Sequence, residues 1–391
     1  MTESTRLRLL WVSDSPVLHT GYGVTTHEIV SRLHATGQYE IAVLGWYHDA
    51  AHYDRRVHPY PLLPGAWGWK PDWLAEVLAE FRPEVLITLG NFSMLAAVQE
   101  VPAQFPGRWV GYFPVEGRPV ARHQARLIDA LDVAVTFTQY AAQEIRRVRP
   151  DCKVQVIPLG VDVQTFRPLS NRVELRRQCE LENRFVVGCV ARNQPRKQLP
   201  LLLRAFAQFA QIHEEAFLYL HSDPDDVGWD LVELADRYGI ADRVGFTPGM
   251  AFVLGVSREE LNEIYNLFDV FALPTMGEGF GLPLLEAMAA GVPVVTTDFA
   301  GGAELVRGRG ELVRVAGWVT EPGHNFELAL ADEQDFLSRL LKLYARPDLR
   351  REYATRGRRF AQTLTWERCA QAWQTLLKEC RECQAPTTDN W

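Results

Sequence analysis

Short apolar runs alternate with amphipathic segments through the first 157 residues. Runs of four to six mostly apolar residues predict buried strands at Leu7–Val12, Ile41–Leu44, Val85–Leu89, Trp109–Phe113, Val133–Thr138 and Val154–Ile157. Helical spacing predicts helices between them, at Val24–His34, Asp72–Phe81, Phe92–Gln99, Val120–Ala130 and Tyr140–Arg147. Because strands that alternate with helices form parallel sheets covered on both faces, this part predicts one doubly wound α/β domain.

A second alternation follows a break in the pattern. The segment Pro158–Pro168 has a proline at each end and a glycine inside, which interrupts strands and helices. Beyond it we predict strands at Phe185–Val190, Ala216–His221, Val244–Thr247, Val270–Pro274 and Val294–Thr297. Helices are predicted at Leu199–His213, Trp229–Tyr238, Glu259–Leu267, Pro283–Ala290, Asp332–Tyr344, Pro347–Gln362 and Trp366–Cys383.

The predicted plan is two doubly wound domains that face each other across a cleft. We place an N-terminal Rossmann-like domain at residues 1–160 and a C-terminal one at 161–365, followed by a helix and polar tail at 366–391. Ligands of such sheets bind beyond the carboxyl ends of the strands. Functional side chains are therefore expected where strands end.

Composition narrows the class of protein. The chain has 391 residues and a formal net charge of -8, so it lacks a global basic footprint for nucleic acid. No leader-like run opens the chain, and no stretch reaches the roughly 18 apolar residues of a spanning helix. The six cysteines are scattered, which favours a reduced, cytoplasmic protein. Cys380 and Cys383 form one C-x-x-C without a second pair, so no metal site is expected.

The strongest local signal is Pro274–Glu286, which reads PTMGEGFGLPLLE. A strand ends, a glycine loop follows, and Pro283 suits the first turn of the next helix. Free N–H groups at such a helix start favour an anion, and glycines permit close approach of a ligand. Glu278 and Glu286 would need partners there, and sugar hydroxyls are suitable ones. A glycine turn with a capping glutamate is the structural alternative.

A basic segment, VARNQPRK, ends the first strand of the second alternation, at Val190–Lys197. Arg192, Arg196 and Lys197 supply cations at the edge where a diphosphate would need neutralising. A solvated basic loop is the alternative interpretation. His221 lies at the end of the next strand. We interpret it either as part of the pocket wall or as a polar strand-end residue whose hydrogen bonds are satisfied within the fold.

Two strand ends of the first domain are candidates for the wall of the predicted cleft that faces the second domain. Gly21 and Gly23 lie between the first strand and helix, where a loop could reach across the cleft, although the spacing is not the dinucleotide fingerprint. Glu116 follows a later strand, in a place suited to acceptor chemistry. Both segments also fit ordinary strand–helix turns. Four basic residues come after Glu116, namely Arg118, Arg122, His123 and Arg126. They are interpreted either as a site for an anionic acceptor or as a solvated helix face.

Glu278–Glu286 resembles the E-x7-E motif of the retaining GT-B glycosyltransferases of group 1, also called family four. The similarity continues through Ala287–Val295, and Arg192 and Lys197 match the cations of that family's donor-diphosphate site. Ile157–Asp162 resembles its interdomain linker, and Thr20–Gly23 its N-terminal glycine loop. The resemblance covers about 350 residues, a span that suits two domains of ordinary size, and it is more specific in the C-terminal half.

The resemblance implies roles for single residues. Glu286 would hold the ribose hydroxyls, and Glu278 would contact the donor sugar. Arg192 and Lys197 would neutralise the leaving diphosphate. The remaining implied donor-binding positions are Gly21, Gly23, His221, Gly279, Phe280, Gly281 and Leu282.

Three departures from the family pattern stand out. Many relatives carry a histidine where Glu116 is the nearest candidate, so we expect Glu116 in the catalytic group with Arg192, Lys197 and Glu278. His221 and its neighbours stand where relatives often have a glycine turn. The segment Thr247–Val256 is unusually long and is expected to shape the base pocket.

The expected activity is metal-independent, cofactor-free transfer of a hexose with retention. The donor would be a UDP- or GDP-linked sugar, and the acceptor a saccharide, lipid-linked sugar or small molecule, with peripheral membrane contact open. The acidic charge argues against nucleic acid as acceptor, whereas the cluster Arg118–Arg126 keeps it open. The alternatives are a sugar-nucleotide epimerase or hydrolase of the same fold and a non-catalytic nucleotide-sugar binding protein.

Overall fold

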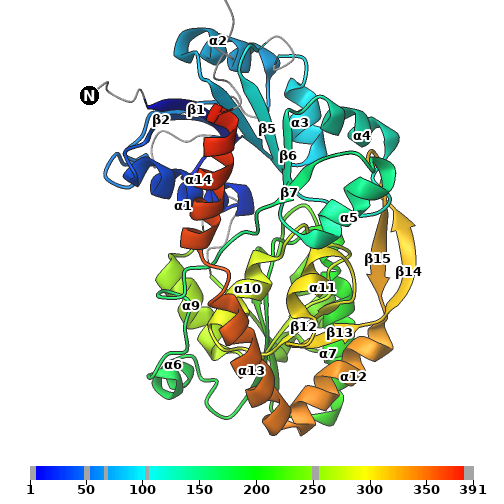
Figure 1. Ribbon diagram of the computed structural model, residues 1–391. Coiled ribbons are helices and arrows are strands. Elements are labelled where there is room, and N and C mark those ends of the chain that lie inside the picture. The colour runs from blue at the N-terminus through cyan, green and yellow to red at the C-terminus, as the bar shows by residue number, and fades with distance from the viewer. Residues whose placement is uncertain (1–5, 48–52, 66–68, 102–104, 249–254, 383–391) are drawn as a thin grey trace, which may run out of the picture.

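A computed structural model describes residues 6–47, 53–65, 69–101, 105–248 and 255–382. Within these ranges the chain forms two parallel sheets with helices on both faces, one above the other in Figure 1. The predicted α/β class with two doubly wound units is confirmed. We call them the N-terminal and C-terminal domains; the exact boundaries at 160 and 365 remain a prediction.

The N-terminal domain is built on a seven-stranded sheet of order β3-β2-β1-β4-β5-β6-β7. Its strands are β1 (Leu7–Asp14), β2 (Tyr39–Trp46), β3 (Leu62–Pro64), β4 (Val85–Leu89), β5 (Arg108–Phe113), β6 (Val133–Thr136) and β7 (Val154–Val156). Its helices are α1 (Gly21–Ala35), α2 (Pro71–Phe81), α3 (Phe92–Val98), α4 (Arg122–Asp129) and α5 (Gln139–Val148). Every residue of β4 is buried, because helices cover both faces of this sheet.

The C-terminal domain is built on a six-stranded sheet of order β10-β9-β8-β11-β12-β13. Its strands are β8 (Phe185–Val190), β9 (Ala216–His221), β10 (Val244–Phe246), β11 (Val270–Leu273), β12 (Val294–Thr297) and β13 (Glu311–Val313). Its helices are α6 (Arg172–Gln178), α7 (Leu199–Ile212), α8 (Leu231–Arg237), α9 (Arg258–Leu267), α10 (Leu282–Ala289), α11 (Ala300–Val306), α12 (Glu333–Ala345) and α13 (Pro347–Ala361). Single 3₁₀ turns lie at η3 (Pro195–Lys197) and η4 (Ala241–Arg243).

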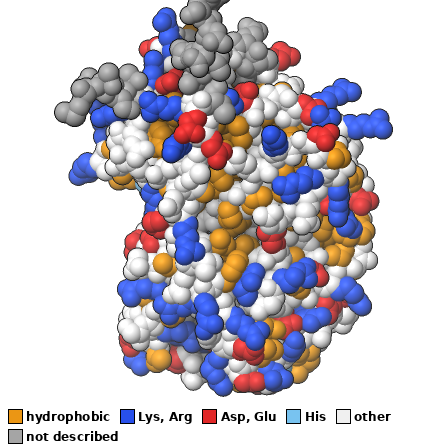
Figure 2. Space-filling view, viewed as in Figure 1, with side chains coloured by type: hydrophobic (Ala, Val, Ile, Leu, Met, Phe, Trp, Pro, Cys, Tyr) orange, Lys and Arg blue, Asp and Glu red, His pale blue; other side chains and the backbone are white. Residues whose placement is uncertain are grey.

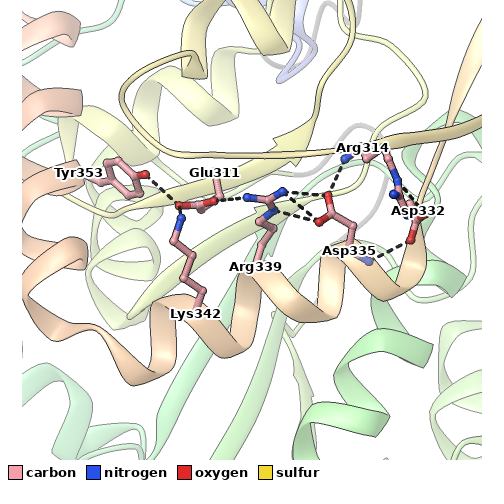
Figure 3. Close-up of polar contacts among 7 residues, drawn as sticks. All are labelled: Glu311, Arg314, Asp332, Asp335, Arg339, Lys342 and Tyr353. Atoms are coloured by element: carbon pink, nitrogen blue, oxygen red, sulfur yellow. Dashed lines mark hydrogen bonds and ion pairs between the residues drawn. The ribbon is translucent and has the colours of Figure 1, made fainter.

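An antiparallel hairpin of β14 (Val315–Thr320) and β15 (Glu327–Ala331) stands apart from both sheets. In Figure 1 it rises from the C-terminal domain along the N-terminal one, near α5. Figure 3 shows how its base is held: Glu311 binds Arg339, Lys342 and Tyr353, and Arg314 binds Asp332 and Asp335. The sequence patterns gave no sign of this hairpin.

The last helix, α14 (Trp366–Glu382), returns to the N-terminal domain and lies along α1 (Figure 1). The Trp373 ring packs edge-on against Trp11 and Tyr112, with ring centroids 5.3 and 5.1 Å apart. Cys380 is buried in this helix, and Cys383 lies outside the described residues. In the described part of the chain, no helix is long and apolar enough to cross a bilayer.

Charge is unevenly spread over the surface. Although the net charge is -8, Figure 2 shows Lys and Arg side chains gathered on the visible face of the C-terminal domain. Exposed arginines of α13 belong to this domain, namely Arg351, Arg356, Arg358 and Arg359. The overall acidity is therefore not representative of this face.

Candidate active site

The loop after β11 carries Glu278 to the carboxyl edge of the C-terminal sheet. The loop ends at Gly281, whose φ of 105° is one that side-chain-bearing residues rarely adopt, and α10 begins at Leu282 with Pro283 in its first turn. Phe280 is buried and Leu282 half-buried. The predicted strand, glycine loop and helix start are therefore all present.

Lys197 and Arg196 come from η3, just beyond β8, and meet Glu278. The Lys197 ammonium lies 2.5 Å from Glu278 Oε1, and the Arg196 guanidinium lies 3.3 Å from the same oxygen. Arg196 also donates to the Gly277 carbonyl at 2.9 Å. Since β8 and β11 are neighbours in the sheet, their carboxyl ends bring these three charges together.

Electrostatics keep this cluster ionised. Burial acts to raise the pKa of Glu278, but the charges of Lys197 and Arg196 outweigh it and lower that pKa to about 2. Burial, and after it the Arg196 charge, lower the pKa of Lys197, which Glu278 opposes. The cluster thus holds Lys197 and Arg196 against the buried Glu278, and Glu116 is a further, partly exposed carboxylate beside Arg196.

Arg192 lies apart from this ion-pair cluster. Its guanidinium pairs with Asp226 at 2.7 Å and is partly exposed. The structure thus brings Lys197 and Glu278 together, as predicted. The arginine that joins them is Arg196, which forms ion pairs with both Glu278 and Glu116. Arg192 instead pairs with Asp226. Arg196 was noticed as a cation in the sequence, yet its spacing from Lys197 gave no reason to prefer it over Arg192.

Glu116 faces this cluster from the N-terminal domain. Its carboxylate lies 3.5 Å from the Arg196 guanidinium, so this ion pair joins the two domains. A Cβ on Gly277 would stand 2.2 Å from the Glu116 carbonyl oxygen, and one on Gly279 would stand 2.2 Å from Pro114. The sequence predicts that these glycines admit a ligand. In the structure, the groups that lie close to them belong to the N-terminal domain.

Gly21 and Gly23 are not in the loop before α1, although that loop does reach the C-terminal domain, where a Cβ on Gly255 would stand 2.7 Å from the His19 ring. Both lie in the first turn of α1, where the hydroxyl of Thr20 accepts a hydrogen bond from the Gly23 N–H at 3.0 Å. A Cβ on Gly23 would stand 2.5 Å from the Leu18 carbonyl oxygen, whereas one on Gly21 would meet open space. The helix therefore begins earlier than the apolar pattern indicated, because its cap is polar.

Tyr22, between these glycines, belongs to the site although the sequence gave no signal for it. Burial raises the pKa of Tyr22 strongly, and the negative charges of Glu116 and Asp14 raise it further. Asp14 ends β1 and accepts a hydrogen bond from the Thr20 hydroxyl at 2.8 Å. Tyr22 and Asp14 thus extend the wall that Glu116 forms.

Glu286 lies on α10 and is partly exposed. Its carboxylate accepts a hydrogen bond from the Tyr265 hydroxyl at 2.8 Å, and burial raises its pKa. This tyrosine holds one carboxylate oxygen in place. The predicted base-pocket segment Thr247–Val256 lies largely outside the described residues, at positions 249–254.

The basic residues after Glu116 do not form one cluster. Arg118 stacks on Trp318 of the hairpin, with its guanidinium carbon 4.0 Å from the ring centroid. Arg122, His123 and Arg126 are exposed on α4. The interpretation of this segment as a single acceptor-anion site is therefore not supported by the positions of its side chains.

His221 is buried at the end of β9, and its Nδ1 lies 2.9 Å from the Thr247 hydroxyl. Burial lowers its pKa from 6.5 to about 4. The unfolded chain therefore binds the proton first, and stability should fall as the pH drops from 6.5 to 4, by about 3 kcal/mol from this residue. Urea unfolding at pH 7 and pH 4.5 measures this effect. Between these two pH values, the free energy of unfolding should fall less for His221→Gln than for the wild type. Equal losses would contradict this assignment.

Comparisons with known proteins identify the family. The family model "Glycosyl transferases group 1" matches residues 184–345. A D-inositol 3-phosphate glycosyltransferase of Corynebacterium jeikeium is 30% identical over 328 residues, which are 83% of this chain and 72% of that relative. A GDP-mannose-dependent phosphatidylinositol monomannoside mannosyltransferase of Mycobacterium tuberculosis is 34% identical over 57% of this chain and 58% of its own.

Solved structures share the architecture over nearly the whole chain. Sucrose-phosphate synthase of Thermosynechococcus elongatus superposes with a TM-score of 0.76 at 19% identity, covering 97% of this chain and 100% of that one. Anabaena Alr3699/HepE, solved with UDP-glucose, gives 0.73 at 17% identity, covering 96% and 100%. With two parallel sheets, a matching family model and a relative aligned over most of both chains, the protein belongs to the group 1 glycosyltransferases of the GT-B fold.

Proposed function

We propose that this protein transfers a hexose from a UDP- or GDP-linked sugar to an acceptor hydroxyl with retention of configuration. The observation that carries the proposal is the cluster of buried Lys197 and Glu278 with partly exposed Arg196 at the carboxyl ends of two adjacent strands. The two cations stand where a diphosphate would need neutralising, and Glu278 offers acceptor oxygens to sugar hydroxyls. Relatives named for GDP-mannose or solved with UDP-glucose support the donor class.

The proposed reaction keeps the acceptor on the same face of the sugar as the leaving group. The bond from the anomeric carbon to the diphosphate oxygen breaks, and the bond to the acceptor oxygen forms on that face. The departing phosphate oxygen takes the acceptor proton, so no separate base is required. Lys197 and Arg196 would stabilise the charge that develops on the diphosphate, which is the kind of preorganised stabilisation that contributes most to catalysis.

The wall made by Glu116, Tyr22 and Asp14 would receive the acceptor. Glu116 lies 3.5 Å from Arg196 across the cleft, so an acceptor hydroxyl held by it would approach the leaving phosphate. Arg192 would join the diphosphate only after leaving Asp226, with which it pairs at 2.7 Å. Carboxylates and a phenol on this wall suit a polyhydroxylated acceptor, because they accept hydrogen bonds from hydroxyls.

Ligand-dependent stability tests the donor class. The full chain is heated with UDP-glucose, GDP-mannose, ADP-glucose or no ligand. A donor at 100 times its Kd should add about 2.7 kcal/mol of stability. We expect a UDP- or GDP-sugar to raise Tm and an ADP-sugar to have no effect. If none of the three raises Tm, the donor site is assigned wrongly.

Product analysis then separates transfer from its alternatives. Incubation of the stabilising donor with a panel of polyols and sugars should give a new α- or β-linked product of the donor's own anomeric configuration, detected by NMR. Epimerised or freed sugar without acceptor would indicate an epimerase or hydrolase. Tight binding without any turnover would indicate a nucleotide-sugar binding protein. Inversion at the anomeric carbon would contradict the proposed stereochemistry.

A further inference from the structure

The β14–β15 hairpin is attached at its base to the loop that carries Glu278. The Ala329 N–H donates to the Met276 carbonyl at 2.9 Å. Buried Gln198 donates to the carbonyls of Pro274 and Ala329 and accepts from the Ala331 N–H at 3.2 Å. The base of the hairpin is therefore tied to the donor loop by hydrogen bonds.

The far end of the hairpin is attached to the N-terminal domain directly beside Glu116. Arg118 and Glu327 exchange two backbone hydrogen bonds, 3.1 and 2.7 Å long, as a short antiparallel bridge between the domains. The ring of Phe326 covers Gly117 so closely that a Cβ there would stand 2.1 Å from it. The contacts of Gly117 and Arg118, the two residues that follow Glu116, thus fix the backbone at Glu116.

Side chains reinforce this attachment at two further points. The Arg118 guanidinium carbon lies 4.0 Å from the Trp318 ring centroid and 5.8 Å from that of Phe299, both from the C-terminal domain. His324 lies 2.6 Å from both Glu321 and Ser93. Because a carboxylate only accepts, His324 Nδ1 donates to Glu321, and the opposite ring nitrogen, Nε2, meets the Ser93 hydroxyl.

The domains also meet elsewhere. Arg196–Glu116 and Arg258–Glu28 are ion pairs between them, and Glu304 of α11 accepts hydrogen bonds from the Gln139 and Tyr140 N–H groups at the start of α5. The hairpin differs in combining backbone pairing, ring stacking and a steric contact at the residues directly after Glu116.

We propose that the β14–β15 hairpin is an interdomain strap that fixes Glu116 against Arg196 and the donor loop. Gly117, Arg118, Trp318 and Phe326 are its positioning residues: they touch neither donor nor acceptor and act through Glu116. The strap makes the acceptor wall and the donor loop one unit, so the 3.5 Å ion pair between Glu116 and Arg196 is set before the acceptor arrives. This inference rests on the proposed transferase activity.

Gly117→Ala tests the strap through its steric contact with Phe326. The added methyl group must push the hairpin away, which should displace Glu116 by a fraction of an ångström to an ångström. We expect kcat to fall about 10- to 100-fold, since displacements of this size cost that much in positioned reactions. The donor Kd, measured by thermal shift with the nucleotide sugar, should stay within about 2-fold, because Lys197 and Glu278 do not move.

The double variant Gly117→Ala with Phe326→Ala supplies the decisive comparison. Removing the ring leaves space for the new methyl group, so the double variant should recover most of the lost kcat, and Phe326→Ala alone should lose less than Gly117→Ala. Thr320→Ala, an exposed position on the same hairpin, should keep wild-type kinetics. A merely structural contact would lower Tm in these variants without this pattern in kcat.

Hydrogen exchange gives a readout that does not depend on turnover. The amides of Arg118 and Glu327 should be protected in the wild type and exchange faster in Gly117→Ala and Trp318→Ala. Faster exchange with wild-type kcat would overturn the strap as a positioning device. If Gly117→Ala does not fold, Trp318→Ala takes its place in the kinetic comparison. Absence of turnover in the wild type would instead count against the transferase assignment.

Discussion

Lys197→Ala should lower kcat by on the order of 10²-fold or more, the cost of losing one preorganised charge partner. The Lys197 ammonium is buried 2.5 Å from Glu278, with Arg196 as the second cation of the cluster. Without Lys197, the site loses one of the two cations beside Glu278 that would meet the diphosphate. Initial rates of nucleoside diphosphate release, with donor and acceptor both saturating, measure the effect.

The protein should stay folded in this variant, because Arg196 remains 3.3 Å from Glu278 and keeps that carboxylate paired. Circular dichroism and the Tm without ligand check this point. Lys378→Ala is the matched control: that lysine is exposed on α14, and its loss should leave the rate unchanged. Near wild-type turnover of Lys197→Ala would refute the role of this lysine at the diphosphate.

A comparison of Arg196→Ala with Arg192→Ala in the same assay decides which arginine neutralises the donor diphosphate. The structure favours Arg196, whose guanidinium lies between Glu116 and Glu278, and places Arg192 with Asp226. We expect Arg196→Ala to lose more activity than Arg192→Ala. The reverse order would mean that Arg192 leaves Asp226 when the donor binds, and the resemblance at that position would then be the better guide.

Arg176→Ala should cost about 3 kcal/mol or more of stability, because several buried carbonyls lose their donor at roughly 1–3 kcal/mol each. The buried guanidinium donates to the carbonyls of Leu267, Leu181 and Arg184 and pairs with Asp269 at 3.0 Å. Its removal leaves the three carbonyls without this donor, whereas Asp269 keeps its ion pair with Arg172 at 2.9 Å. Urea unfolding monitored by tryptophan fluorescence measures the loss.

The neighbouring Arg177 supplies the control for this stability change. Its side chain is 61% exposed and pairs with Glu174 of the same helix, whose side chain is 49% exposed. Surface pairs of this kind contribute little, so Arg177→Ala should change stability by less than about 0.5 kcal/mol. Equal losses for the two variants would show that Arg176 is not the residue that fastens α6 to the sheet.

The elements that the sequence missed are short, polar or rich in glycine. The helix α11 begins AGGAELV, where two glycines weaken the helical pattern, and α6 reads RVELRRQ, with four charged residues among seven. The strand β3 has three residues, one of which is a proline. Each forms because neighbouring elements pack against it, as Arg176 does for α6, and local periodicity does not record such contacts.

Local patterns determined a large part of this protein. Buried strands in parallel sheets are continuous apolar runs, and helices repeat at 3.6 residues, so two doubly wound sheets could be predicted from single segments. The loop with Glu278 and the basic segment with Lys197 were found for the same reason, since each directly follows an apolar strand. Where parallel strands are neighbours, the residues after them must meet.

Only the tertiary structure decided what joins the two domains. It paired Arg196, rather than Arg192, with Glu116 and Glu278, and it showed that Gly277 and Gly279 admit the opposite wall. It also revealed the hairpin and its bridge from Glu327 to Arg118. These partners lie some 80 to 210 positions apart in the chain. Their contacts depend on how two finished sheets dock, and no repeat in the sequence carries that information.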